Sequence, residues 1–370
     1  MGYGAEARVL GAPRTDQPSP PWHQPAPPQE PSTAPREDGP RSYGPPAAAP
    51  TVDWNYTEGI RASELVPARK VAPGRGWRRL IYDATGGLVN FGPSPEELQH
   101  THLEARIRTL LRGRYKIGVL GKGGVGKTTV AACVGTVFAQ LRQDDRVVAI
   151  DADTAFGKLG ARVDPRAVGS YWDLAADEHL DTFADVRSRV GANDAGLFVL
   201  AGESSTARRH VLDPAIYREA ASRLDRHFTI TLVDCGSALD SPVTQEALRD
   251  LDALIVVSSP WVDGASAAGQ ILDWLANRGM TGLLQRTVLV LNDSDGHADK
   301  RTRTVLAQQF ANHGLVVIEV PFDSHLRPGG VIDVANEMSP KTRHCFYEIA
   351  AAIADHFAST TQGRRGQRLR

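Results

Sequence analysis

One stretch of the chain decides its fold: Lys116-Ile117-Gly118-Val119-Leu120-Gly121-Lys122-Gly123-Gly124-Val125-Gly126-Lys127-Thr128-Thr129. A short apolar run ends in a glycine-rich turn, and the turn opens into helix-compatible sequence that continues to Leu141. The residues from Gly121 to Thr128 fit the P-loop template G-x-x-x-x-G-K-[ST]. The sequence therefore predicts a phosphate-binding loop between a buried strand and a helix.

Each residue type in this loop has a chemical reason. The glycines let backbone N–H groups turn toward phosphate oxygens without a Cβ clash; they are Gly121, Gly123, Gly124 and Gly126. Lys127 can reach the β- and γ-phosphates, and the Thr128 hydroxyl can bind Mg²⁺. Val125 and Thr129 complete the expected cradle, and the following helix directs its N-terminal dipole at the same phosphates.

From residue 116 onward, strand and helix patterns alternate. The predicted strands are 116–120, 146–151, 197–202, 228–234, 253–259, 286–292 and 316–320. The predicted helices are 127–142, 206–224, 241–250, 263–278, 299–312 and about 340–358. Nearly continuous apolar strands indicate a parallel sheet that is covered on both faces. We therefore expect an α/β doubly wound, mostly parallel sheet with the nucleotide at the carboxyl ends of the strands.

Composition narrows the class of protein. The net charge of −1 argues against a general polyanion binder. The cysteines Cys133, Cys235 and Cys345 form no closely spaced pair, which favours a reducing cytoplasm and argues against a disulfide framework, a zinc site or an iron–sulfur cluster. No apolar run is long enough for a transmembrane helix, and we expect no signal peptide at the N-terminus.

The segments outside the alternating region differ from it in composition. Residues 1–50 contain 13 of the 24 prolines and little apolar content, so we expect a disordered arm that is either a spacer or a docking arm for a protein partner. Residues 51–115 form a basic adaptor with aromatic anchors and a helix from Pro95 to about Arg112. The adaptor could dock against the core, a partner or a membrane surface, or it could be a plain solvated basic face. Residues 359–370 form a basic tail.

Lys122 makes the loop unusual, because it gives the form K-G-G-x-G-K-T-T. This deviant Walker A motif resembles that of the MinD/ParA family of P-loop ATPases, the SIMIBI type of P-loop fold. The resemblance implies an ATP-dependent homodimer in which the extra lysine reaches the partner's phosphates. A second cation can neutralise charge on the transferring phosphoryl group, as an arginine finger does. Residues 116–358 would then be the ATPase domain, with ATP and Mg²⁺ as its cofactors.

Three acidic residues match further motifs of that family. Asp151 and Asp153 follow a strand in the D-x-D pattern, and Asp234 ends the strand Ile230-Thr231-Leu232-Val233 like a Walker B acid. The resemblance implies that Asp153 orients or activates the attacking water, and that Asp151 and Asp234 support Mg²⁺ together with Thr128. After Asp153, however, the chain lacks the Pro-Gln-Gly typical of partition ParA proteins.

The base pocket also follows from the resemblance. Asn292 would hydrogen-bond adenine, and the backbone from Pro321 to Asp323 would border it; either could instead be ordinary turn chemistry. Asn292 leads into Asp293-Ser294-Asp295 and not into the N-K-x-D of guanine sites, which favours ATP.

Four stretches resemble one branch of the family, the EspI-like ATPases associated with actinobacterial type VII (ESX) secretion. They are Gly76-Trp77-Arg78-Arg79 with Asn90-Phe91-Gly92-Pro93-Ser94-Pro95, Asp234-Cys235-Gly236, Ser258-Ser259-Pro260-Trp261-Val262-Asp263-Gly264, and Asp273-Trp274-Leu275. This branch implies a slow, partner-stimulated ATPase switch that positions or regulates secretion machinery. It implies a cytoplasmic protein that its partners recruit peripherally to the inner membrane.

Two alternatives remain open at the level of sequence. A ParA-type partition ATPase would bind DNA non-specifically, but the net charge and the sequence after Asp153 weigh against it. A MinD-type positioning ATPase needs a C-terminal amphipathic helix with large apolar anchors, and residues 356–365 do not supply one.

Overall fold

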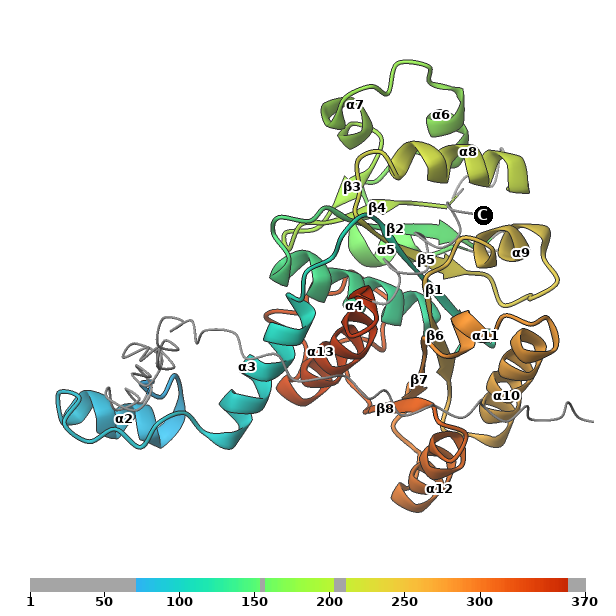
Figure 1. The fold of residues 1–370 in the computed structure, drawn as a ribbon. Helices are drawn as coiled ribbons and strands as arrows, with labels where there is room; N and C mark the ends of the chain where they lie inside the picture. The colour runs from blue at the N-terminus through green and yellow to red at the C-terminus, as the bar shows by residue number, and fades with distance from the viewer. Residues whose placement is uncertain (1–70, 154–156, 203–210, 359–370) are drawn as a thin grey trace, which may run out of the picture. The chain divides into compact units, whose positions relative to one another are not determined.

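A computed structural model of the chain describes residues 71–153, 157–202 and 211–358 (Figure 1). The predicted proline-rich arm, the first part of the basic adaptor and the basic tail lie outside these residues. Among the residues described, none of the helices combines the length and the apolar composition that crossing a bilayer requires.

The centre of the fold is one eight-stranded sheet with the order β3-β4-β2-β5-β1-β6-β7-β8. Its strands are β1 (Tyr115–Gly121), β2 (Val147–Ala152), β3 (Gly191–Ala192), β4 (Leu197–Leu200), β5 (Ile230–Cys235), β6 (Ala253–Ser258), β7 (Thr287–Asn292) and β8 (Val316–Val320). All neighbouring strands are parallel except β3 and β4. Because β1 and β5 are central and buried along their whole length, their carboxyl ends are held rigidly side by side.

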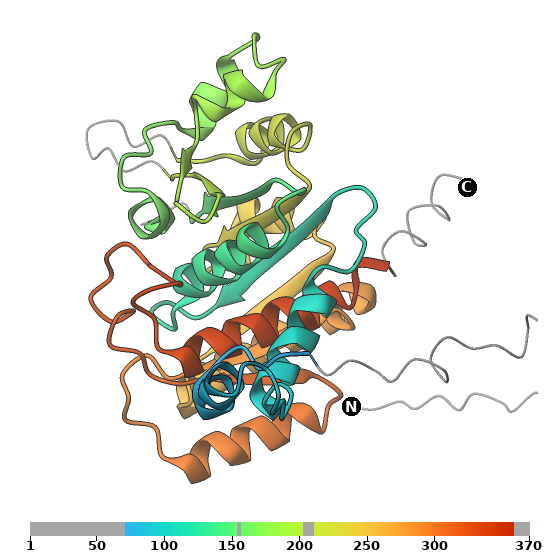
Figure 2. The same cartoon turned by 90° about the vertical axis from the view of Figure 1, so that its left-hand side faces the viewer.

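Helices cover both faces of the sheet, and side chains alternate between two cores. In β2, Val147 and Ala149 enter one core while Val148 and Ile150 enter the other. The first core contains α3 (Pro95–Ile107), α4 (Lys127–Leu141), α5 (Leu159–Val163) and α13 (Pro340–Ala354), which cover the face seen in Figure 2. The second lies under α6 (Tyr171–Ala176), α7 (Phe183–Arg187), α8 (Pro214–Leu224), α9 (Pro242–Leu248), α10 (Val262–Asn277), α11 (Thr281–Leu284) and α12 (Lys300–Ala311).

The seven predicted strands are confirmed, and so is the doubly wound architecture. The predicted helix 206–224 begins later than expected, because Asp213 caps α8 by accepting from the amides of Ala215 and Ile216, and Pro214 occupies the first helical position. The helix from Pro95 ends at Ile107, its last buried residue, and not near Arg112. The sequence did not predict the two-residue strand β3 or the short helices α2 (Gly76–Ala84), α5, α6, α7 and α11.

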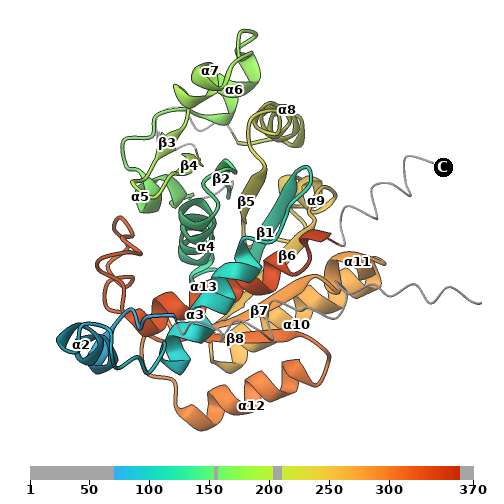
Figure 3. The same ribbon diagram turned by 60° about the vertical axis from the view of Figure 1, so that its left-hand side comes forward.

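The helix α3 joins the N-terminal part of the described chain to the sheet. Ser94 and Glu97 form a capping box at its start, which explains why it begins at Pro95. It lies against α13 (Figure 3), where Arg106 pairs with Asp355 at 2.6 Å and where Leu103 and Ile107 of α3 enter the first core. The helix α3 is therefore part of the packed structure.

Candidate nucleotide-binding site

The loop between β1 and α4 has the backbone that a phosphate cradle requires. Gly124 and Gly126 have φ values of 84° and 95°, in the left-handed region that favours glycine. Gly126 caps α4, so the first amides of that helix open into the loop. A Cβ added at Gly126 would collide with the side-chain amide of Asn292, and one added at Gly121 would collide with the backbone oxygen of Val257. Close packing therefore requires glycine at positions 121 and 126, and a positive φ favours it at 124 and 126.

Lys127 lies at the start of α4 and is almost completely buried. Its Nζ donates to the backbone oxygen of Lys122 at 3.3 Å, which folds the side chain back over the loop. A buried ammonium group with a single long hydrogen bond of this kind is well placed to bind a phosphate oxygen.

Thr128 and Asp234 meet at the end of the central strands. The Thr128 hydroxyl donates to Asp234 Oδ2 at 2.6 Å, while Asp234 Oδ1 is buried and has no hydrogen-bond partner among the residues described. Burial, reinforced by the nearby Asp151 carboxylate, raises the pKa of Asp234 to about 7. A hydroxyl and a buried carboxylate with one unused oxygen are hard ligands that suit Mg²⁺. Thr128 and Asp234, two of the residues predicted to hold Mg²⁺, therefore fit this ion.

Asp151 is adjacent to Asp234 in the register of β2 and β5. Its carboxylate accepts from the amide of Asp153 at 3.2 Å and from the amide of Leu159 at 2.9 Å. Burial raises its pKa to about 6. In this structure Asp151 therefore anchors the segment that follows β2, and a contact with Mg²⁺ stays a prediction.

Asp153 lies just beyond the end of β2, half-buried, opposite the turn that follows β5. A Cβ at Gly236 would stand 3.6 Å from its Oδ1. This places the Asp153 carboxylate next to Gly236, which follows β5 two residues after Asp234. The predicted water-activating residue and the predicted metal ligand thus share one edge of the sheet.

Lys122 forms an ion pair that the sequence did not predict. Its Nζ lies 2.6 Å from Asp263 Oδ2, and both side chains are exposed. Asp263 stands in the first turn of α10, and its hydrogen bond from Lys122 lowers the pKa of that carboxyl. Exposed ion pairs of this kind contribute little to stability, so this contact can be exchanged for a stronger one.

A pocket of about 160 Å³ opens beside the loop. The predicted residues that line it are Gly124, Gly126, Thr129, Asn292, Pro321 and Asp323. The structure thus brings the loop and the predicted base-binding residues together. Two of these side chains, however, already form hydrogen bonds within the protein. Asn292 Nδ2 donates to the backbone oxygen of Val125 at 2.8 Å, and Asp323 accepts from the amides of His325 and Ser339.

Two arginines in this pocket were missed by the sequence reasoning. Arg162 Nη2 donates to Thr129 Oγ1 at 3.1 Å, while its Nη1 donates to the backbone oxygen of Leu326 at 3.2 Å. Arg327 also lines the pocket. A guanidinium group beside the loop suits the bidentate binding of phosphate. Neither residue belongs to a recognisable motif, so no local signal in the sequence could have identified them.

The position of Asn292 leads to a testable prediction. Asn292→Asp replaces the donor to Val125 with a buried carboxylate facing a carbonyl oxygen, and we expect the free energy of unfolding to fall by about 2 kcal/mol. Thermal unfolding of the nucleotide-free protein measures this loss, and Asn292→Ala should cost less because it adds no buried charge. If Asn292→Asp unfolds like the wild type and only loses ATP, then Asn292 binds the base and does not support the loop.

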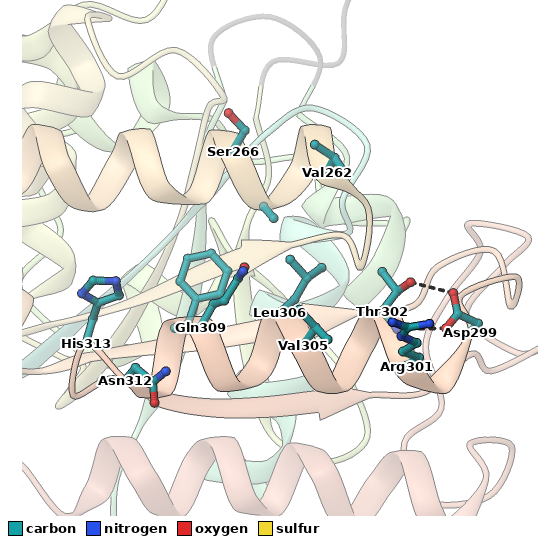
Figure 4. A pocket seen from close by; sticks show the side chains of 12 residues that line it. Val262, Ser266, Asp299, Arg301, Thr302, Val305, Leu306, Gln309, Asn312 and His313 are labelled. Atoms are coloured by element: carbon teal, nitrogen blue, oxygen red, sulfur yellow. Dashed lines mark hydrogen bonds between the residues drawn. The ribbon is translucent and has the colours of Figure 1, made fainter.

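A larger hollow of about 1140 Å³ lies elsewhere, between α10 and α12 (Figure 4). Its lining is mainly apolar, and Leu306 and Phe310 contribute to its floor. Its acid, Asp299, is used as the cap of α12 and accepts from Thr302. Size therefore does not mark the nucleotide site; the phosphate cradle and the carboxylates do.

The fold and site define a class of protein, and comparisons with known proteins agree. Residues 118–328 match the family of the CobQ/CobB/MinD/ParA nucleotide binding domain, and the chain belongs to this family. It is 34% identical over 300 residues to the ESX-1 secretion-associated protein EspI of Mycobacterium tuberculosis, covering 80% of this chain and 44% of that protein. The septum site-determining protein MinD of Thermotoga maritima is 25% identical over 191 residues, 51% of this chain and 67% of that protein.

Solved structures show the same fold. The cell division ATPase MinD of Pyrococcus furiosus aligns with a TM-score of 0.51 and 21% identity, covering 66% of this chain and 99% of that one. A ParA family ATPase from Chlorobium tepidum aligns with a TM-score of 0.53 and 20% identity, covering 64% of this chain and 99% of that one. The resemblance expected from the P-loop is therefore confirmed. The chain spans less than half the length of its EspI relative.

Proposed function

We propose that this protein binds and slowly hydrolyses ATP and that ATP holds two copies of it together as a molecular switch. One observation carries the proposal: Lys127, Thr128 and Asp234 converge on a glycine loop whose extra lysine, Lys122, is exposed at its mouth. Lys127, Thr128 and Asp234 suit the nucleotide bound to their own copy. The exposed Lys122 suits the phosphates of the nucleotide bound to a second copy.

The chain's own residues have separable roles in this proposal. The loop amides and Lys127 bind the β- and γ-phosphates, and Thr128 and Asp234 would hold Mg²⁺. When bound, Mg²⁺ neutralises charge on the phosphate oxygens. Asp153 stands at the open end of β2, where its carboxylate can orient a water and accept its proton. Arg162 joins Thr129 at the wall of the adjoining pocket and orients the nucleotide there.

Dimer formation requires Lys122 to exchange its partner. In the isolated chain it is paired with Asp263, and in the proposed dimer it would pair with phosphate oxygens of the other copy. A phosphate carries more negative charge than one carboxylate and lies in a drier environment, so the exchange favours the dimer. The ion pair with Asp263 holds the lysine near the mouth of the loop until ATP arrives.

The partner of the proposed switch is secretion machinery of the type VII (ESX) class. The similarity to EspI supports this, because it extends beyond the nucleotide-binding domain to 80% of this chain. The proline-rich arm and the part of the basic adaptor outside α2 are the proposed docking segments for the protein partner. We propose a cytoplasmic location with peripheral recruitment to the inner membrane.

The test is the oligomeric mass of the full chain with ADP, with ATP and Mg²⁺, and for Lys122→Ala with ATP and Mg²⁺. We expect a monomer with ADP, a dimer with ATP, and a loss of at least about tenfold in dimer affinity for Lys122→Ala, because a buried phosphate contact is removed. Light scattering coupled to size exclusion measures the mass.

Asp263→Asn is the matched control for this experiment, because it removes the cis ion pair without touching the phosphate contact. We expect it to dimerise at least as well as the wild type. If the wild-type protein is a monomer with ADP and also with ATP and Mg²⁺, the switch is refuted. A monomeric nucleotide-binding adaptor would then be the better interpretation.

A further inference from the structure

The helix α2 has an apolar side that residues 71–153, 157–202 and 211–358 leave largely uncovered. Its sequence places Trp77, Leu80, Ile81 and Ala84 along one stripe at helical spacing. An amphipathic helix in a globular protein normally buries such a stripe, but no residue of α2 is buried. Trp77 is 59% exposed and Leu80 is 71% exposed. Trp77 and Leu80 are therefore turned to the solvent, whereas Ile81 is half-buried.

Neighbouring side chains extend this surface. Phe91 lies beside Trp77 with ring centroids 5.5 Å apart, and it is itself exposed. The turn at Gly86-Gly87 carries Leu88, which is 91% exposed. We call Trp77, Leu80, Leu88 and Phe91 the α2 patch. Isolated exposed leucines are common, whereas a group of large apolar side chains in one small unit indicates a binding surface.

Polar contacts flank the α2 patch, and the one from Arg78 to Pro93 ties the helix to the segment before α3. Arg78 donates to the backbone oxygen of Pro93 at 3.0 Å, and Arg79 pairs with Asp83 at 2.8 Å. The guanidinium of Arg78 also lies over the Trp77 ring, 5.6 Å from its centroid. The contact with Pro93 fixes the helix against the segment before α3, so the side chains of the α2 patch stay outward.

Basic residues outnumber acidic ones in the chain around the α2 patch. Residues 71–97 contain Arg75, Arg78 and Arg79 against three acids: Asp83, which is paired with Arg79, and Glu96 and Glu97 in the first turn of α3. The chain immediately before this segment adds Arg69 and Lys70. Arginine beside exposed tryptophan, leucine and phenylalanine is the composition of a helix that lies in the interface of a membrane with anionic lipid.

We propose that the α2 patch docks the chain onto the surface of an anionic lipid bilayer, with α2 lying in the plane of the interface. A helix of nine residues is about 13 Å long, which suits lying on a bilayer and is too short for crossing it. A lipid surface can accept apolar side chains without having a matching shape. This suits the α2 patch, whose side chains project from a short helix and from the turn that follows it. This proposal is independent of the nucleotide switch.

Flotation of the full chain with lipid vesicles tests the proposal, and ADP is present throughout so that the outcome does not depend on the switch. The vesicles contain phosphatidylcholine with about 30% phosphatidylglycerol, or phosphatidylcholine alone. We expect binding to the anionic vesicles and at least about tenfold weaker binding to the neutral ones. Leu80→Glu should lower binding to the anionic vesicles by at least about tenfold, because it places a carboxylate in the apolar stripe.

Val168→Glu is the matched control, since Val168 is 89% exposed but lies between α5 and α6, outside the α2 patch. It should bind like the wild type, and both variants should unfold at the wild-type temperature. The proposal is overturned if the wild type does not bind the anionic vesicles. That result would assign the α2 patch to a protein partner. It is also overturned if Leu80→Glu binds like the wild type, or if Leu80→Glu changes only the oligomeric mass.

Discussion

Lys127→Ala is expected to weaken ATP binding by roughly 100-fold or more, the largest loss of affinity we predict for a single substitution. The reason is geometric. Lys127 is almost completely buried, and its hydrogen bond within the described residues is the 3.3 Å contact with the backbone oxygen of Lys122, which leaves its charge available to a phosphate. No other cation of the described P-loop occupies this position, because Lys122 points to Asp263. Titration calorimetry with ATP and Mg²⁺ measures the affinity.

The control is Lys300→Ala, which removes the same side chain from an exposed position at the start of α12. It should bind ATP like the wild type. Lys127→Ala should still fold, since the side chain supports the loop through one long hydrogen bond. Retention of micromolar ATP affinity in a folded Lys127→Ala protein would show that the nucleotide binds somewhere other than this loop.

Asp153→Asn is expected to reduce the rate of ATP hydrolysis by about 10²- to 10⁴-fold while changing ATP affinity only a few-fold. A carboxylate that orients water acts mainly in the transition state, whereas the loop amides and Lys127 act in the ground state as well. Asn keeps the size of the side chain and removes its charge. Single-turnover hydrolysis with a labelled γ-phosphate measures the rate.

Substitutions of two other acidic residues serve as comparisons for this result. Asp240→Asn changes an exposed acid in the segment after β5 and should leave the rate unchanged. Asp151→Ala should lower the thermal stability, because it removes the side chain that accepts two backbone amides and positions the segment after β2. If Asp153→Asn hydrolyses ATP at the wild-type rate, another group must activate the water.

The sequence predicted those parts of the molecule in which a local pattern is enough. Seven strands were recognised because each is a short apolar run, and the loop was recognised because G-x-x-x-x-G-K-T fixes both its backbone and its chemistry. The short helices α5, α6, α7 and α11 have too few turns to establish a period, so they escaped prediction. The start of α8 was misplaced because its cap and proline outweigh the helical composition of the residues before it.

The site contacts that were missed are long-range. Asn292 reaches Val125 across 167 positions of sequence, and Lys122 reaches Asp263 across 141. A motif describes neighbours along the chain and gives no information on which distant side chain will support it. The exposed stripe of α2 is a different case. Its amphipathic spacing could be read from Trp77, Leu80 and Ile81, but only the fold shows that the described structure leaves it largely uncovered.

The packing of α3 against α13 has a practical consequence for expressing parts of this protein. The family match begins at residue 118, and a fragment cut at that point would lack α3. Its removal would strip Leu103 and Ile107 from the first core, leave Asp355 without Arg106, and uncover Tyr347, which the ring of His100 contacts at 4.6 Å. A truncated nucleotide-binding domain would therefore expose an apolar face that the longer chain covers, and association through that face could be mistaken for the proposed ATP-dependent dimer. Fragments meant for mass measurements should begin before Ser94, so that the helix and its capping box stay intact.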